Sequence, residues 1–120
     1  MTLVAIEPHA WKLSELPQLI RSAEGFPEIL AALEAGHSAT IDGAWGSSCA
    51  LVAAALASRV PHTLFVVASH IADLDDLCDD IASFSGRPVG LFPAWETLPR
   101  EEVVADEIYG QRLRLLRSLA

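Results

Sequence analysis

Residues 43–50 read Gly-Ala-Trp-Gly-Ser-Ser-Cys-Ala, a glycine-bearing turn between a short apolar run and an alanine-rich segment. A working phosphate-binding loop has the form G-x-x-x-x-G-K-[ST], in which backbone N–H groups and the lysine hold phosphates and the hydroxyl binds Mg²⁺. Gly43 takes the place of the first glycine, and Ser48 stands at the second. Cys49 replaces the lysine and Ala50 replaces the hydroxyl. The frame of the motif is kept, but most of its defining residues are lost.

The replacements predict a loop without catalytic power. A charge-assisted hydrogen bond contributes roughly 1.5–3 kcal/mol, so losing the lysine and the Mg²⁺ ligand leaves ATP binding weak and hydrolysis negligible. We therefore expect no catalytic residue, no bound cofactor and no metal, and only a vestigial phosphate loop made of Gly43, Gly46, Ser48, Cys49 and Ala50. A glycine-rich turn also occurs in α/β proteins that never bound a nucleotide, and these residues alone leave that alternative open.

One residue of the loop invites a separate hypothesis. Trp45 is bulky enough to fill the space that phosphates would occupy. The loop would then be blocked by the indole, in addition to lacking the phosphate-binding residues.

Composition restricts the class of protein. A chain of 120 residues with 52% hydrophobic content is one domain or part of one, and it is too apolar to be disordered. Its net charge of −8 argues against this chain binding a nucleic-acid backbone by itself. The two cysteines form no C-x-x-C motif and no secretory signal or membrane-spanning run is visible, so a cytoplasmic location is expected.

Helices are predicted on both sides of the loop. Pro17 and Pro27 stand where first-turn prolines belong, which predicts two short helices before the loop. The alanine-rich segment 49–59 predicts a buried helix. Apolar residues from 71 to 84 recur at helical spacing, and Gly86 follows as the expected end of that helix.

Three short runs between these helices predict strands. They are residues 39–42, which lead into the loop, and the apolar runs 63–68 and 89–92. An alternation of strand and helix predicts an α/β fold with an open, mostly parallel sheet of the P-loop NTPase and helicase type. We divide the chain into a helical lead-in, residues 1–36, and the first part of an α/β domain, residues 37–120. Since the last periodic segment ends without a closing signal, we expect an incomplete N-terminal fragment of a longer protein.

Four segments, taken in order, resemble a known family. They are the defective loop at 48–50, the apolar run 64–68, the block Phe-Pro-Ala-Trp-Glu-Thr-Leu-Pro at 92–99, and the segment Glu-Ile-Tyr-Gly-Gln-Arg-Leu at 107–113. Through these four segments the chain resembles the N-terminal UvrB-like module of bacterial transcription-repair coupling factors, the Mfd proteins. The pentapeptide Trp-Glu-Thr-Leu-Pro at 95–99 is the most specific part of this resemblance.

The resemblance implies a function that spacing alone does not show. Such factors are cytoplasmic, ATP-driven double-stranded-DNA translocases that displace stalled RNA polymerase and recruit UvrA for nucleotide-excision repair. ATP and Mg²⁺ belong to a motor far downstream, whereas the N-terminal module is a non-catalytic platform that works with the rest of the same polypeptide. Ala94 and the pair Arg100-Glu101 depart from the family pattern around the tryptophan. The subdomain that makes most of the UvrA contact in these factors is inserted beyond Ala120.

The candidates for contact with a partner are Trp95, Glu96 and Arg112. Tryptophan is over-represented among interface hot spots, but Trp95 between two prolines also fits a local core plug. Arg112 belongs to an amphipathic segment whose arginines could instead pair with carboxylates elsewhere. The aspartates at 73–80 fit a solvated helix face better than a metal site.

Two further functions stay open at this point. One is a weak ATP-binding domain of a UvrB-like helicase, in which backbone N–H groups alone retain some nucleotide. The other is a stand-alone α/β protein-interaction domain.

Overall fold

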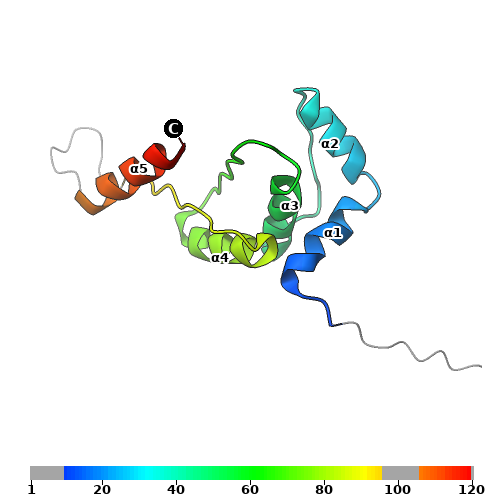
Figure 1. Cartoon of the computed structure of the whole chain (residues 1–120), viewed down its shortest axis with the longest axis horizontal. Helices are drawn as coiled ribbons and strands as arrows, with labels where there is room; N and C mark the ends of the chain where they lie inside the picture. Colours follow the sequence, from blue (N-terminus) through cyan, green and yellow to red (C-terminus); the bar gives the residue numbers. More distant parts are fainter. Residues whose placement is uncertain (1–9, 96–105, 120) are drawn as a thin grey trace, which may run out of the picture.

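The computed structural model of the chain describes residues 10–95 and 106–119, and all regular structure in these ranges is helical (Figure 1). The α-helices are α1 (Leu16–Arg21), α2 (Phe26–Glu34), α3 (Ser47–Ala57), α4 (Leu74–Ser85) and α5 (Asp106–Leu119). Two 3₁₀ turns, η1 (Leu13–Glu15) and η2 (Ile71–Asp73), lead directly into α1 and α4.

The first two helices begin as the sequence predicts. Pro17 and Pro27 each lie in the first turn of their helix, where the N–H that proline lacks would have no intrahelical partner. Ahead of α1, the Lys12 N–H donates to the Glu15 carboxylate at 2.9 Å and thereby ties the chain to the turn η1. The expected boundary between residues 36 and 37 remains a prediction.

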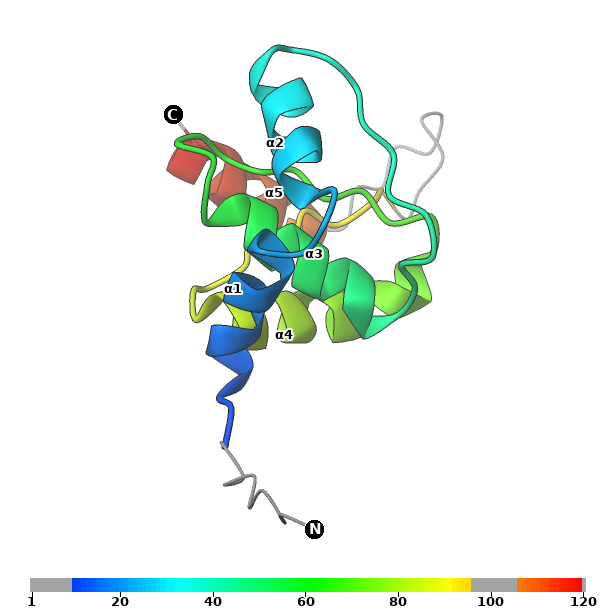
Figure 2. The ribbon, with the colours of Figure 1, turned by 90° about the vertical axis from the view of Figure 1, so that its right-hand side faces the viewer.

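The core lies where α3 packs on α4, and α1 with the preceding turn η1 packs against both helices (Figure 2). Ala50, Ala53 and Ile81 form its buried cluster, and Leu77 and Phe84 pack around them. Ala54 and Ala55 are also buried, because alanines line most of the circumference of α3 and let neighbouring helices approach closely. The predicted burial of this helix is confirmed.

Helix α4 has the amphipathic pattern that the sequence predicts. It ends at Gly86, whose φ of 64° places it in the left-handed region that glycine adopts without strain. Its apolar residues face the core and its aspartates occupy exposed or half-buried positions. The helix and its end are therefore both confirmed.

The prediction of an open parallel sheet is wrong. No strand is present in residues 10–95 or 106–119, and the three expected strand segments, 39–42, 63–68 and 89–92, run as irregular chain. The unit predicted around residues 43–50 thus has its loop and its helix but lacks the strand that a P-loop fold requires. The fold described here is all-helical.

The physical reason lies in where backbone hydrogen bonds are made. A helix satisfies its N–H and C=O groups within one segment, whereas a strand needs a neighbouring strand to satisfy them. In this structure the apolar runs do not pair with one another, and their side chains stay in contact with water. Phe65 is 71% exposed and Val67 is 92% exposed. The hydrophobic, β-branched composition of these segments predicted that they would be buried, but in the tertiary structure they are not.

Helix α5 lies at the opposite end of the molecule from α1 and α2, beyond α4 (Figure 1). It contacts the irregular segment before it, and a side chain added at Gly90 would meet Leu115 at 2.5 Å. A largely apolar cavity of about 450 Å³ lies between α3, α4, α5 and the irregular segments 60–66 and 87–92. The apolar runs therefore pass along the helices without filling the space beside them.

In the part of the chain that the structure describes, the helices fall short of the length and apolar content needed to cross a membrane.

Candidate functional site

The loop at residues 43–50 is held by hydrogen bonds to its own groups. The Trp45 N–H donates to Ser48 Oγ at 2.7 Å, and the Ser48 hydroxyl in turn donates to the Trp45 carbonyl at 2.7 Å. The N–H groups of Ser48 and Cys49 donate to the carbonyls of Trp45 and Gly46 at 3.2 and 3.0 Å. At the loop entrance the Gly43 N–H donates to the Asp42 carboxylate at 2.8 Å. Several N–H groups that a phosphate would need are thus already used.

The vestigial loop residues have different surroundings. Ala50, at the position of the Mg²⁺-binding hydroxyl, is fully buried in the core against α4. Cys49, at the lysine position, is exposed. Gly46 precedes α3 with a φ of 55°, a conformation that L side chains rarely adopt. The residues at the lysine and hydroxyl positions therefore lie in different environments, Cys49 in solvent and Ala50 in the core.

Trp45 does not plug the loop. Trp45 is 84% exposed, so its side chain points into solvent. The hypothesis that the indole occupies the phosphate space is wrong, because Ser48 closes the turn instead.

The predicted partner-facing residues Trp95 and Arg112 lie together. The Arg112 guanidinium carbon is 3.8 Å from the Phe92 ring centroid and 4.5 Å from the Trp95 ring centroid. Arg112 also donates to the Pro93 carbonyl through Nη1. Tyr109, one turn earlier on α5, stacks on Trp95 with ring centroids 6.5 Å apart. We call the four side chains of Phe92, Trp95, Tyr109 and Arg112 the Arg112 cluster.

The Arg112 cluster is partly buried and partly open to solvent. Phe92, Trp95 and Tyr109 are 41–50% exposed, so each ring packs on one side and presents the other. Cation–π contacts of this kind contribute about 0.5–1 kcal/mol each at exposed sites. The cluster therefore holds α5 against the segment before it and also presents aromatic surface. Glu96, the third candidate, lies outside the described residues.

Sequence reasoning missed Phe92 and Tyr109 as members of this cluster. Tyr109 and Arg112 are three residues apart, which places them on one face of a helix, and this spacing was a usable signal. Phe92 offered no such signal, because its position beside Arg112 depends on a contact between residues twenty apart in the chain.

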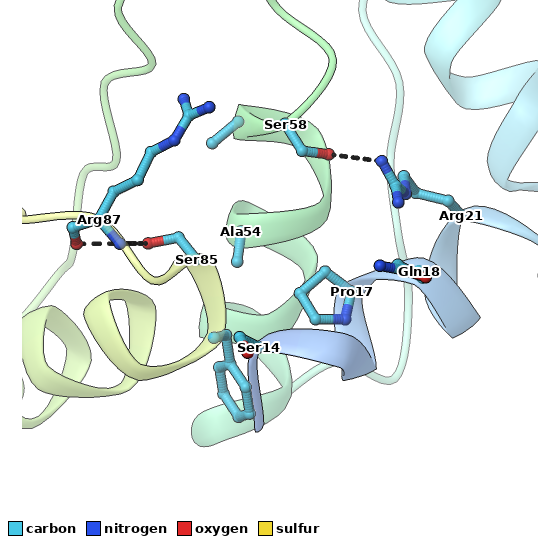
Figure 3. A pocket seen from close by; sticks show the side chains of 10 residues that line it. Ser14, Pro17, Gln18, Arg21, Ala54, Ser58, Ser85 and Arg87 are labelled. Carbon is cyan, nitrogen blue, oxygen red and sulfur yellow. Dashed lines mark hydrogen bonds between the residues drawn. The ribbon is translucent and has the colours of Figure 1, made fainter. Parts of the chain in front are cut away.

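A second hollow, of about 170 Å³, lies between α1 and the C-terminal ends of α3 and α4 (Figure 3). Arg21 donates to Ser58 Oγ at 3.2 Å, and the Arg87 N–H donates to Ser85 Oγ at 3.2 Å. Arginines suit this position because the carboxyl ends of helices carry partial negative charge. The hollow contains none of the predicted site residues.

The remaining chemistry-bearing residues are dispersed. Among the described residues, no three His, Cys, Asp or Glu side chains come together in a way that would hold a metal ion. Burial raises the pKa of the Cys78 thiol, and the charges of Asp75 and Asp79 raise it further. A thiol that is kept protonated in this way is a poor nucleophile.

Comparison with known proteins gives relatives over most of the chain. It is 36% identical over 104 residues to transcription-repair-coupling factors of Mycobacterium bovis and Mycobacterium tuberculosis. The match covers 86% of this chain but only 8% of the length of those relatives. No family model matches the chain. No solved structure matches it either.

Proposed function

Because the chain is related to a segment of the transcription-repair-coupling factors, we propose that it serves transcription-coupled repair as a non-catalytic interaction module. In this proposal the parent protein is an ATP-driven DNA translocase that displaces stalled RNA polymerase and recruits UvrA. ATP and Mg²⁺ are used by a motor outside this segment. The module acts with the rest of its polypeptide in the cytoplasm.

One observation carries the non-catalytic assignment. The N–H groups of Trp45, Ser48 and Cys49 are hydrogen bonded within the loop, so binding a phosphate would require breaking several of these bonds first. The Asp42 carboxylate at the loop entrance would also repel a phosphate. The lysine that would offset these costs is replaced by Cys49.

Calorimetric titration with Mg-ATP tests this assignment. We expect no binding or millimolar binding to the 120-residue chain. Micromolar binding would overturn the assignment and favour the alternative, a weak nucleotide-binding domain of a UvrB-like helicase. The variant Cys49→Lys tests the loop geometry. A loop that still had the shape of a phosphate-binding loop would gain affinity for Mg-ATP when the lysine is restored. We expect no gain.

The Arg112 cluster supports the interaction role. Tryptophan, tyrosine and arginine are the residue types most enriched among interface hot spots, and here all three share one partly exposed surface. We propose that RNA polymerase binds at or next to this surface when the parent protein engages a stalled complex.

Repair in cells tests the role of the cluster. Arg112→Ala in the gene that encodes this chain should slow repair of ultraviolet lesions in the transcribed strand, with no effect on the other strand. Arg114→Ala is the matched control, since Arg114 lies two residues away on α5 and donates only to Gly110 within the described chain. If the transcribed strand is repaired as fast in Arg112→Ala as in Arg114→Ala, the cluster has no interaction role.

A further inference from the structure

Trp45 is a large apolar side chain whose backbone is fixed while its indole is free in solvent. Its N–H and its carbonyl are both hydrogen bonded to Ser48 Oγ, each at 2.7 Å. The indole is 84% exposed, compared with 52% for Trp11 and 47% for Trp95. Because the Trp45 backbone is already held, a partner that covers the indole has to order only its side-chain torsions, which favours binding.

Asp42, three residues before Trp45 in the chain, defines the kind of partner. Asp42 is exposed, and its Oδ1 accepts the Gly43 N–H at 2.8 Å, which fixes the carboxylate at the start of the loop. Within residues 10–95 and 106–119, no cation pairs with this carboxylate. The chain as a whole carries sixteen acidic and eight basic residues, so its field attracts cationic partners.

We propose that Trp45 and Asp42 form a docking surface for an arginine-bearing segment of a partner protein. A guanidinium stacks on the face of an indole and can at the same time donate to a carboxylate through its planar fork. Lysine offers only a point charge, so arginine is the better fit. Trp45 occupies a position that the phosphate-loop pattern leaves variable, and here it supplies the contact with a protein.

This inference goes beyond the proposed function and does not depend on it. It requires neither the motor of the parent protein nor the Arg112 cluster. Mg-ATP calorimetry tests the loss of phosphate binding, whereas the experiment below tests peptide binding at Trp45, so either result stands without the other.

The test is a titration of the ¹⁵N-labelled chain with a short oligo-arginine peptide, followed by the indole N–H resonances. The Trp45 indole resonance should shift and saturate, while those of Trp11 and Trp95 should shift less. Trp45→Ala should weaken binding about two- to fivefold, the range expected for an exposed cation–π contact. Asp42→Asn should weaken it to a similar extent, and added salt should weaken binding to the unmodified chain.

Controls separate this surface from general charge attraction. An oligo-glutamate peptide should leave the Trp45 resonance unchanged, and Trp11→Ala should leave the affinity for oligo-arginine unchanged. Ser48→Ala should lower the affinity by releasing the Trp45 backbone, whereas Ser48→Thr, which keeps the hydroxyl, should not. A Trp45 resonance that does not shift, or an equal loss of affinity in Trp45→Ala and Trp11→Ala, would overturn the inference.

Discussion

The helix pair α3–α4 and the segment 63–68 are both rich in apolar residues, yet only the helices bury them. Ala50 and Ala55 are fully buried, whereas Val67 is 92% exposed. A helix completes its backbone hydrogen bonds alone and needs only one neighbour for its apolar face. An extended run needs partners for both its backbone and its side chains. In this molecule, apolar residues are buried where the backbone N–H and C=O groups already have hydrogen-bond partners within a helix.

The largest expected effect comes from placing a charge in each region. Ala50→Asp puts a carboxylate at a fully buried position without a partner, which costs several kcal/mol and should unfold the α3–α4 pair. Val67→Asp should change the free energy of unfolding by less than about 0.5 kcal/mol, as for other surface positions. Urea unfolding followed by circular dichroism measures both. Equal destabilisation by the two changes would show that segment 63–68 is buried in solution.

Removing apolar volume sharpens the same comparison. Ile81 is 9% exposed and belongs to the buried cluster, so Ile81→Ala should lower the free energy of unfolding by about 2–3 kcal/mol. Phe65 loses more atoms on replacement by alanine but is 71% exposed, so Phe65→Ala should cost less than about 0.5 kcal/mol. The same denaturation experiment checks both variants. A larger effect at Phe65 than at Ile81 would reverse our assignment of the core.

Helix α5 lies between these two cases, because it is held by the Arg112 cluster. Arg112→Ala removes two cation–π contacts and a hydrogen bond, so it should loosen α5 by about 1–2 kcal/mol. Amide hydrogen exchange within α5 should quicken while that of α3 stays unchanged. Arg114→Ala provides the comparison within the same helix. If both variants exchange alike, Arg112 does not anchor α5.

The smallest expected effect concerns the two thiols. The pKa of Cys78 is raised, so the folded state favours the neutral thiol; stability from this source is complete below the ordinary thiol pKa of about 9 and declines as pH rises above it. Cys49 is exposed and should react with iodoacetamide faster than Cys78 at every pH from 7 to 9. Mass spectrometry of the two peptides measures the ratio. Cys78→Ser should remove the decline in stability above about pH 9.

The predicted helices were confirmed and the predicted sheet was wrong, and one cause explains both results. Pro17, Pro27 and Gly86 act on the residues next to them, so their effect can be read from the chain itself. The fate of segments 63–68 and 89–92 depends on whether another segment pairs with them, which composition does not encode. Local signals were therefore predictable and non-local pairing was not.

The candidate site divides in the same way. That the loop lacks a phosphate-binding lysine follows from Cys49 alone. That Ser48 closes the loop and leaves Trp45 in solvent required the structure, because it depends on two hydrogen bonds between residues three apart. Trp95 and Arg112 were both candidates, but their contact joins segments on either side of residues 96–105.

The sequence by itself determined helices α1 to α4, the end of α4 at Gly86, the loss of the phosphate-binding residues and the relationship to transcription-repair-coupling factors. These depend on neighbouring residues or on residue identity, which the chain carries directly. Only the tertiary structure decided which apolar residues are buried, that Trp45 is free, and that Arg112 lies between two aromatic rings. Burial and the ring contacts of Arg112 depend on which distant segments meet, because they require a partner that local preferences do not choose. The exposure of Trp45 depends instead on the hydrogen bonds by which Ser48 closes the loop.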